Sequence, residues 1–242
     1  MSTEAHKNFY ELDSERFWDP RVGMTGRDLD VYPLLAGLSG RLLEYGCGSG
    51  SLLLGLAREA RFGECIGVDV SERTLQAVER AWIDLNVAEK DKVKLMVPQA
   101  DHLPGVPDES IDVVISASSL EHVLDPYVVL DELYRIAKPS GRLICTVPNS
   151  AYLRHSVSML FGIQPRTGTD EPVDNWRQAG WDGMHLHTFT RSSLEILLKD
   201  CGWIPEKWTG AGTRFNSLGF GRLRRRFPAF LSGELLTVCR RK

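Results

Sequence analysis

Short apolar segments alternate with helix-like segments along most of this chain, and this alternation constrains the fold more than any other feature. Five such apolar segments come first, at residues 41–46, 64–70, 92–97, 111–117 and 141–148. Strands that alternate with helices form parallel sheets, because each helix returns the chain to the edge where the next strand begins. The nearly continuous apolar character is typical of strands buried on both faces. The sequence therefore predicts an α/β fold with a mostly parallel sheet and helices on both faces.

Capping residues mark where three of the helices begin. Ser71, Asp125 and Thr190 each precede a segment whose apolar residues recur at helical spacing. Their side chains can accept hydrogen bonds from the free N–H groups of a first helical turn. Strand-like segments at residues 203–210 and 234–242 follow the third helix, so we expect two more strands after the first five.

Composition and charge exclude several classes of protein. The chain has 242 residues, 43% of them hydrophobic, which suffices for the core of a full domain. Its formal net charge of -3 gives no overall attraction to nucleic acid or anionic lipid. No uncharged apolar stretch reaches the roughly 18 residues of a membrane span, and the first segment lacks the apolar core of a signal peptide. We expect a cytoplasmic protein whose five cysteines are reduced core residues.

Three glycines, Gly46, Gly48 and Gly50, stand at alternate positions directly after the first apolar segment. In a doubly wound sheet the ligand lies beyond the carboxyl ends of the strands, where the first strand turns into the first helix. Glycine there permits positive φ angles and a close approach of ligand to backbone. The GxGxG spacing differs from the GxGxxG of dinucleotide-binding loops, and the Lys of a GxxxxGK[ST] loop is missing. The loop therefore predicts a ligand with no phosphate at this position.

Two carboxylates follow at the ends of the next two strand-like segments. Asp69 ends the second segment, 19 residues after Gly50, where a carboxylate can accept hydrogen bonds from both hydroxyls of a ribose. Asp101 follows the third segment, where the adenine of the same ligand would lie, and it can accept a hydrogen bond from the exocyclic amine. The expected ligand therefore contains a nucleoside.

Four stretches of the chain carry a family pattern. They are LLEYGCGSG, IGVDVSERTL, QADHLPGVPDESIDVVISASSLEHVLDP and LDELYRIAKPSGRLICTVPN. In this order and spacing they resemble the successive motifs of class I S-adenosylmethionine-dependent methyltransferases, over residues 40–149. The resemblance implies a Rossmann-like sheet of seven strands with the last strand antiparallel, and residues 234–242 fit that strand. The stretch MHLHTFTRSSLEILLKDCGWIPEKW is also similar to a block of small-molecule methyltransferases of types 11 and 23.

The resemblance implies S-adenosylmethionine as the methyl donor and S-adenosylhomocysteine as the product. Glu44 stands where the family has an acid that orients the methionine part, Asp69 would hold the ribose, and Asp101 would frame the adenine. The positions implied to contact the cofactor are Glu44, Gly46, Cys47, Gly48, Gly50, Asp69, Val70, Asp101, His102, Leu103 and Ser118.

We expect one methyltransferase domain over residues 1–242 with four parts. These are an N-terminal helical cap at 1–38, a cofactor-binding core at 40–148, an acceptor-site insertion or lid at 149–188, and a C-terminal part at 189–242 that contains a basic insertion at 211–232. Long irregular stretches of this kind are usually functional or disordered.

Histidines are the candidates for proton transfer. The sulfonium of S-adenosylmethionine already activates its methyl group, so transfer mainly requires a nucleophile placed in line with it. An oxygen or nitrogen acceptor can still need a general base, usually histidine. The candidates are His122, His185 and His187, and for each a structural hydrogen bond is the alternative.

The acceptor is expected to meet residues that follow the fifth strand-like segment. Asn149, Tyr152 and Trp181 could stack on a ring and hydrogen-bond its hydroxyls, which suits a sugar or another small metabolite. A lid whose aromatic side chains simply pack on the sheet is the alternative. We expect no metal. Asp182, His185 and His187 could form a site, but the fourth segment ends in ISASS, without the acid that metal-dependent catechol-type methyltransferases use at this position.

Other subclasses are excluded by missing motifs. The chain has no [DNS]PP[YFW] box, which enzymes that methylate exocyclic amines carry, and no Pro-Cys pair at the position where a carbon-5 cytosine enzyme needs its thiolate.

The sequence therefore predicts methyl transfer to an oxygen, or a nitrogen, of a small hydroxylated acceptor by a monomer or homodimer. The alternatives are an enzyme acting on RNA or another macromolecule, and a non-catalytic cofactor-binding regulatory module. A cluster of Arg222, Arg224, Arg225 and Arg226 suggests weak contact with a membrane or phosphate, and a solvated loop or dimer contact is the other explanation. Stable binding of nucleic acid is not expected.

Overall fold

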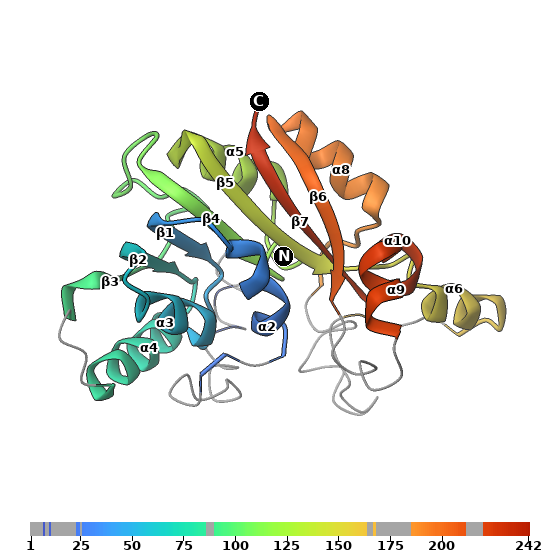
Figure 1. The fold of residues 1–242 in the computed structure, drawn as a ribbon, viewed down its shortest axis with the longest axis horizontal. Coiled ribbons are helices and arrows are strands. Elements are labelled where there is room, and N and C mark those ends of the chain that lie inside the picture. Colours follow the sequence, from blue (N-terminus) through green and yellow to red (C-terminus); the bar gives the residue numbers. More distant parts are fainter. Residues whose placement is uncertain are drawn as a thin grey trace.

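The structure is a computed structural model. It describes residues 26–85, 90–163, 185–211 and 220–242, together with Lys7, Tyr10, Gly23, Met24 and Thr167. These residues form one mixed sheet with helices on both faces (Figure 1). The strands are β1 (Gly40–Tyr45), β2 (Phe62–Val68), β3 (Val93–Met96), β4 (Ile111–Ala117), β5 (Ala137–Pro148), β6 (Trp203–Ala211) and β7 (Glu234–Arg241).

The strand order is β3-β2-β1-β4-β5-β7-β6. Strands β1 to β5 are parallel to one another, and β7 lies antiparallel between β5 and β6. The predicted fold class, including the antiparallel last strand, is confirmed. The chain runs outward from β1 to β3 and then continues on the other side of β1 with β4. The strand order thus reverses between β1 and β4, which is where sheets of this kind bind their ligands.

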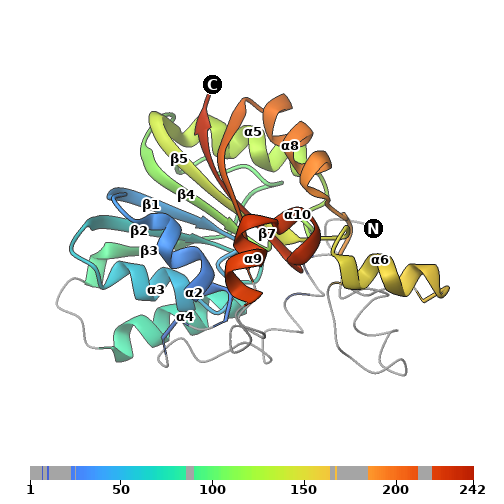
Figure 2. The ribbon, with the colours of Figure 1, turned by 45° about the vertical axis from the view of Figure 1, so that its right-hand side comes forward.

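The helices divide between the two faces of the sheet. Their bounds are α2 (Asp28–Val31), η3 (Tyr32–Leu35), α3 (Ser51–Ala57), α4 (Glu72–Asp84), η4 (Lys90–Lys92), α5 (Pro126–Ile136), α6 (Leu153–Leu160), α8 (Arg191–Asp200), α9 (Phe220–Arg226) and α10 (Pro228–Leu231). Helices α3 and α4 pack on one face, and α5 and α8 pack on the other (Figures 1 and 2).

The core explains why the strand segments are continuously apolar. In β1, the neighbouring residues Leu42 and Leu43 are both fully buried, but Leu42 belongs to the cluster under α3 and α4, and Leu43 to the cluster under α5 and α8. Successive side chains of a strand point to opposite faces, so a sheet covered on both faces needs an apolar residue at every position.

The three predicted helix starts are confirmed by their caps. Ser71 Oγ accepts a hydrogen bond from the Thr74 N–H at 3.1 Å, Asp125 caps α5, and Thr190 caps α8. The strand boundaries differ from the prediction by at most two residues, except at the start of β5. Strand β5 begins at Ala137, four residues earlier than expected, because Ala137 pairs with Ile111 before an irregular stretch shifts the register. Strand β2 ends at Val68, so its acid lies in the loop beyond the strand.

All five cysteines are buried and free, as expected for reduced core residues. Among the described residues, no helix is long and apolar enough to cross a membrane.

Candidate functional site

The glycine loop has a conformation that other residues would not tolerate. Gly46, Gly48 and Gly50 have φ angles of +72°, +49° and +76°, in the left-handed region that favours glycine. A Cβ added to Gly46 would lie 2.5 Å from Cβ of Ser119, and one added to Gly50 would lie 2.8 Å from a methyl group of Val78. Gly46 and Gly50 are therefore required both by backbone geometry and by the close approach of another element, and Gly48 is favoured by backbone geometry.

The main-chain N–H groups of the loop tie it to the end of β2. Gly46 and Cys47 donate to the Val68 carbonyl at 2.8 and 2.9 Å, and Gly48 donates to Asp69 Oδ2 at 2.9 Å. The other oxygen of Asp69 accepts from the Ser71 N–H at 3.0 Å. These bonds orient the carboxylate at the ligand-binding end of the sheet.

Glu44 is a buried acid at the end of β1. Its residue is only 4% exposed, and Oε2 has no hydrogen-bond partner in the part of the chain that the structure describes. Burial, and after it the charge of Asp28, raises the pKa of Glu44 well above its ordinary value. An unsatisfied buried carboxylate beside a bare glycine loop fits the cationic amino group of a ligand.

The loop after β3 reaches back to β1 through a second acid. Asp101 Oδ1 accepts a hydrogen bond from the hydroxyl of Tyr45 at 2.8 Å. Ala100 and Asp101 have φ angles of +48° and +64°, and Ser118 after β4 has +50°. Such strained non-glycine residues cluster at binding sites, where the surrounding structure holds them in place.

The next two predicted cofactor residues differ in exposure. The side chain of His102 is largely exposed, whereas Leu103 is fully buried and its N–H donates to Glu132 Oε1 at 2.6 Å. Glu132 also forms an ion pair with Arg135 at 2.7 Å. Its hydrogen bond from Arg135 and that from the Leu103 N–H lower the pKa of Glu132 to about 2, despite its desolvation. Val70 is half-buried beside Asp69.

Two of the three predicted histidines lie together. The rings of His122, after β4, and His185 meet edge to face with centroids 4.6 Å apart. Nδ1 of His185 is 2.8 Å from Oγ1 of Thr167. His187 lies elsewhere: its Nε2 is 2.9 Å from the Val123 carbonyl. The structure thus brings His122 and His185 together and gives His187 a main-chain partner, as in the structural alternative.

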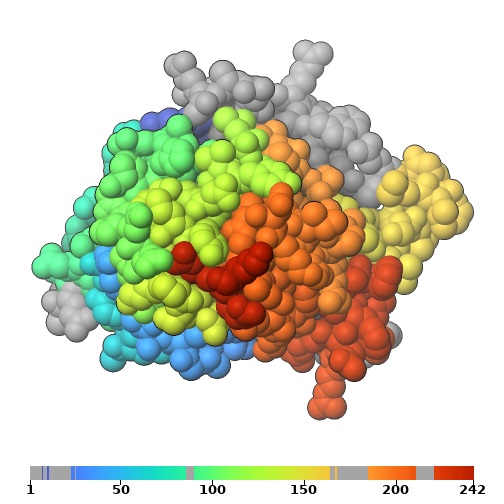
Figure 3. Space-filling model, turned by 90° about the horizontal axis from the view of Figure 1, so that it is seen from above, coloured from blue at the N-terminus to red at the C-terminus, as the bar shows by residue number. Residues whose placement is uncertain are grey.

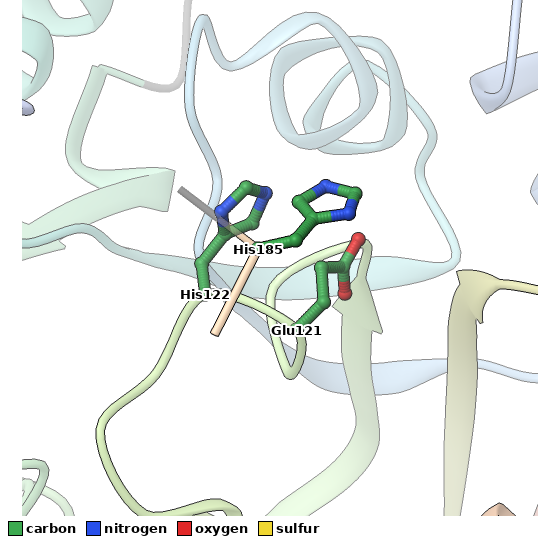
Figure 4. A group of neighbouring side chains, drawn as sticks. All are labelled: Glu121, His122 and His185. Carbon is green, nitrogen blue, oxygen red and sulfur yellow. The ribbon is translucent and has the colours of Figure 1, made fainter. Parts of the chain in front are cut away.

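Glu121 is a residue of this site that the sequence analysis did not single out. Figure 4 shows its carboxylate next to the rings of His122 and His185. Its residue is 1% exposed, and neither carboxylate oxygen has a hydrogen-bond partner among the described residues. Burial raises the pKa of Glu121 to about 8. Glu121 directly precedes His122 in the segment SSLEHVL, but nothing in this segment indicates that the glutamate is buried.

The expectation that Asn149 contacts the acceptor needs correction. Asn149 is fully buried, and its Nδ2 donates to the carbonyls of Pro228, Ala229 and Ser232 at 3.2, 3.1 and 2.8 Å. Its Oδ1 accepts from the Ala151 N–H at 3.1 Å. The amide therefore fastens the end of β5 to α10 and its following turn, since buried polar groups are held by their internal partners.

The other two predicted acceptor residues have different outcomes. Tyr152 is half-buried just before α6, and its ring meets that of His155 edge to face at 5.3 Å. Trp181 lies outside the described residues, as does Asp182.

The predicted arginine cluster lies on α9. Arg222, Arg225 and Arg226 are exposed and Arg224 is half-buried. The neighbouring Phe227 and Phe230 are 53% and 65% exposed, although they are large apolar residues.

Comparison with known proteins is consistent with this geometry. The profile of a type 23 family described as a methyltransferase domain matches residues 24–205. A ubiquinone biosynthesis O-methyltransferase of Alkalilimnicola ehrlichii is 31% identical over 64% of this chain and 62% of its own length. A 27-O-demethylrifamycin SV methyltransferase of Amycolatopsis mediterranei is 28% identical over 88% of this chain and 75% of its own. The chain thus spans less than two thirds of the first of these relatives.

Solved structures share the fold along the entire chain. Magnesium protoporphyrin IX methyltransferase from Synechocystis, solved with bound S-adenosylhomocysteine, superposes with a TM-score of 0.65 at 17% identity and covers 100% of both chains. A Thermotoga maritima structure described as a possible histamine N-methyltransferase has a TM-score of 0.64 at 19% identity, over 98% of this chain and 100% of its own. With the profile match over most of its length, the chain belongs to the methyltransferase domain family of class I S-adenosylmethionine-dependent enzymes.

Proposed function

We propose that this protein transfers the methyl group of S-adenosylmethionine to an oxygen, or secondarily a nitrogen, of a small hydroxylated acceptor such as a sugar or another small metabolite. The observation that carries this proposal is the cluster of Glu121, His122 and His185 at the turn after β4, because this turn packs against the glycine loop. Ser119 packs against Gly46, and its carbonyl accepts a hydrogen bond from the His122 N–H at 3.0 Å.

The residues present fit the cofactor. The buried carboxylate of Glu44 would hold the amino group of the methionine part, beside the bare backbone at Gly46, Gly48 and Gly50. Asp69 would accept hydrogen bonds from the ribose hydroxyls, because two main-chain donors already orient its oxygens. When bound, S-adenosylmethionine supplies an activated methyl group on a sulfonium.

The remaining cofactor contacts come from loops that other elements hold in place. Asp101, which Tyr45 positions, would face the adenine together with His102 and Leu103. Cys47 and Val70 would contact the cofactor from the loops after β1 and β2, and Ser118 would border the methionine part. The charged groups that we assign to the cofactor thus belong to strand ends or to strained turns.

Histidine would remove the proton from the acceptor. An acceptor hydroxyl becomes a good nucleophile only as it loses its proton, and an imidazole has a pKa suited to that transfer near neutral pH. His122 and His185 are the candidates, with Glu121 next to both. Two relatives are named for methylation at an oxygen, in ubiquinone biosynthesis and of demethylrifamycin, which supports oxygen as the first choice.

A labelled-methyl assay tests this proposal. The protein is incubated with S-adenosylmethionine labelled in its methyl group, and mass spectrometry follows transfer to a catechol-type ring, to a sugar and to fractions of a cell extract. We expect labelled product, with a turnover that falls about 10²–10⁴-fold in His122→Ala while the affinity for S-adenosylhomocysteine is unchanged. An unchanged rate in that variant would remove His122 as the base.

The same assay judges the alternatives. Cofactor binding by calorimetry with no labelled product from any fraction would favour a non-catalytic module. RNA that becomes labelled, with salt-sensitive binding lost when the arginines of α9 are replaced, would favour a macromolecular acceptor.

We also propose that α9 and α10 make a weak contact with an anionic lipid surface. Arginines and exposed phenylalanines stand together there, and Figure 3 shows this segment in red-orange beside the projecting α6 in yellow. The apolar residues Leu160 and Phe161 at the end of α6 are 84% and 78% exposed. Basic groups flanked by apolar side chains favour the interface of an anionic membrane.

A further inference from the structure

Three side chains with metal-binding atoms converge at the turn after β4. The carboxylate of Glu121 and ring nitrogens of His122 and His185 all lie within 4.8 Å of one another. Figure 4 shows the three side chains directed toward a shared space. Bonds from zinc to nitrogen or oxygen are about 2.0–2.2 Å long, so two ligands of one ion lie at most about 4.4 Å apart, and an ion here would draw the three side chains slightly closer together.

Main-chain hydrogen bonds hold this convergence. The N–H groups of Leu186 and His187 both donate to the carbonyl of Glu121, at 2.7 and 3.1 Å. His122 is held in turn by its own N–H bond to Ser119. The segment that carries His185 is therefore attached to the turn after β4, and the position of the three donors does not depend on side-chain contacts alone.

A cation next to Glu121 would stabilise its buried carboxylate. This carboxylate is almost completely buried, and in the described part of the chain neither of its oxygens has a hydrogen-bond partner. A buried carboxylate without a partner is costly, so such groups are protonated, paired with a cation or bound to a metal. The nearby Arg27 is 3.4 Å from the carboxylate of Glu234 instead.

We propose that Glu121, His122 and His185 bind one divalent transition-metal ion of the zinc class. Two imidazoles and one carboxylate form a donor set that suits zinc and its first-row neighbours, whereas magnesium and calcium prefer oxygen ligands alone. Three protein ligands leave at least one coordination position open, as in catalytic zinc sites. This set differs from the combination of Asp182, His185 and His187 that the sequence offered.

The ion would deepen the proposed function, on which its role rests. In its open position it takes the acceptor hydroxyl and lowers the pKa of that group, as zinc does for bound water. Because both histidines are then bound to the ion, the acceptor proton passes to solvent and not to an imidazole, and the ion takes the place of the histidine base. The oxygen then forms a bond to the methyl carbon, while the bond from carbon to sulfur breaks and its electron pair stays on sulfur. No oxidation or reduction occurs, and the methyl ether and S-adenosylhomocysteine are the products.

The test uses the full chain after removal of metal with a chelator. Zn²⁺ is titrated by calorimetry, and Co²⁺ is added separately to record the absorption bands of a bound ion. We expect one ion per chain. In Glu121→Gln and in His185→Ala the affinity should fall by more than about tenfold, since the loss of supporting outer residues alone typically costs that much.

His155→Ala is the matched control, because it removes a half-buried histidine of α6 outside the cluster and should keep the metal. Affinity for S-adenosylhomocysteine, measured on each variant, shows that it is folded. Failure of wild-type protein to bind Zn²⁺ or Co²⁺, or unchanged binding in both cluster variants, would overturn the site. Methyl transfer is scored separately, so a protein without transferase activity would leave the metal result intact.

Discussion

The main-chain N–H of Gly48 donates a hydrogen bond of 2.9 Å to Oδ2 of Asp69. This bond joins the loop after β1 to the loop after β2, which are the two loops proposed to hold opposite parts of the cofactor. Because Ser71 donates to the other oxygen, the carboxylate is oriented before any ligand arrives. Such preorganisation reduces the ordering cost of binding.

Replacement of Asp69 by alanine should weaken cofactor binding. Hydrogen bonds to a charged group contribute about 1.5–3 kcal/mol, so the affinity for S-adenosylhomocysteine should fall about tenfold to a hundredfold. Calorimetry measures this, and circular dichroism checks the fold. Asp91→Ala removes an exposed carboxylate and should bind the ligand normally. Equal affinities of Asp69→Ala and wild-type protein would contradict the ribose assignment.

Replacement of Gly46 by alanine should destabilise the protein and impair the loop. The new Cβ would lie 2.5 Å from Cβ of Ser119, and the φ angle of +72° is unfavourable for alanine. We expect a loss of at least about 1 kcal/mol in the free energy of unfolding, measured with urea. Gly63→Ala is the control, because its added Cβ would have no atom within 4 Å. Similar stability of the two variants would show that the loop adapts.

The free energy of unfolding should fall at acidic pH as Glu132 becomes protonated. Its pKa is lowered from 4.5 to about 2, mainly by hydrogen bonds from Arg135. A lowered pKa in the folded state stabilises the protein fully above about pH 4.5, and this contribution disappears as the pH falls toward 2. Glu132→Gln should therefore lose about 1–3 kcal/mol at pH 7, with the difference from wild type shrinking below pH 4.5.

Urea denaturation at pH 7, 4 and 3 measures this difference. Glu79→Gln, which changes an exposed glutamate of α4, should follow wild type at each pH. A loss in Glu132→Gln that is the same at pH 7 and pH 3 would mean that its charge is not the cause.

The arginines of α9 should promote binding to anionic vesicles. Each basic residue near such a surface contributes about 1 kcal/mol, so the double replacement Arg225→Ala and Arg226→Ala should weaken co-sedimentation by more than about tenfold at low salt. Arg58→Ala with Arg80→Ala removes the same charge from exposed positions elsewhere. An equal loss of vesicle binding in both double variants, or equal binding to zwitterionic vesicles, would argue against a specific lipid contact. Inhibition of vesicle binding by inorganic phosphate alone would indicate a phosphate site.

Local features of the fold could be predicted because their causes lie within a few residues. The caps at Ser71, Asp125 and Thr190 depend on a side chain and the N–H groups of the following turn. The early start of β5 was missed because Ala137 also continues the helical pattern of α5, and only its pairing with Ile111 decides between strand and helix.

Residues of the site could be predicted where a sequence pattern reflects local backbone geometry. They could not be predicted where a side chain's role depends on contacts with residues far along the chain. Asn149 stands at a strand end that suits ligand binding, yet its amide is used by the carbonyls of residues 228, 229 and 232. Those residues lie far along the chain, so nothing near Asn149 indicates them. Glu121 was missed for the same reason, because its burial depends on how distant segments pack around it.

The sequence by itself determined the α/β class, the alternate glycines and the acids that follow successive strands, because strand periodicity and turn geometry are local properties. The tertiary structure alone decided that Tyr45 holds Asp101, that His185 joins His122 while His187 does not, and that Glu121 lies buried beside this pair. These relationships depend on contacts between residues far apart in the chain, which form only when the sheet and its loops are assembled.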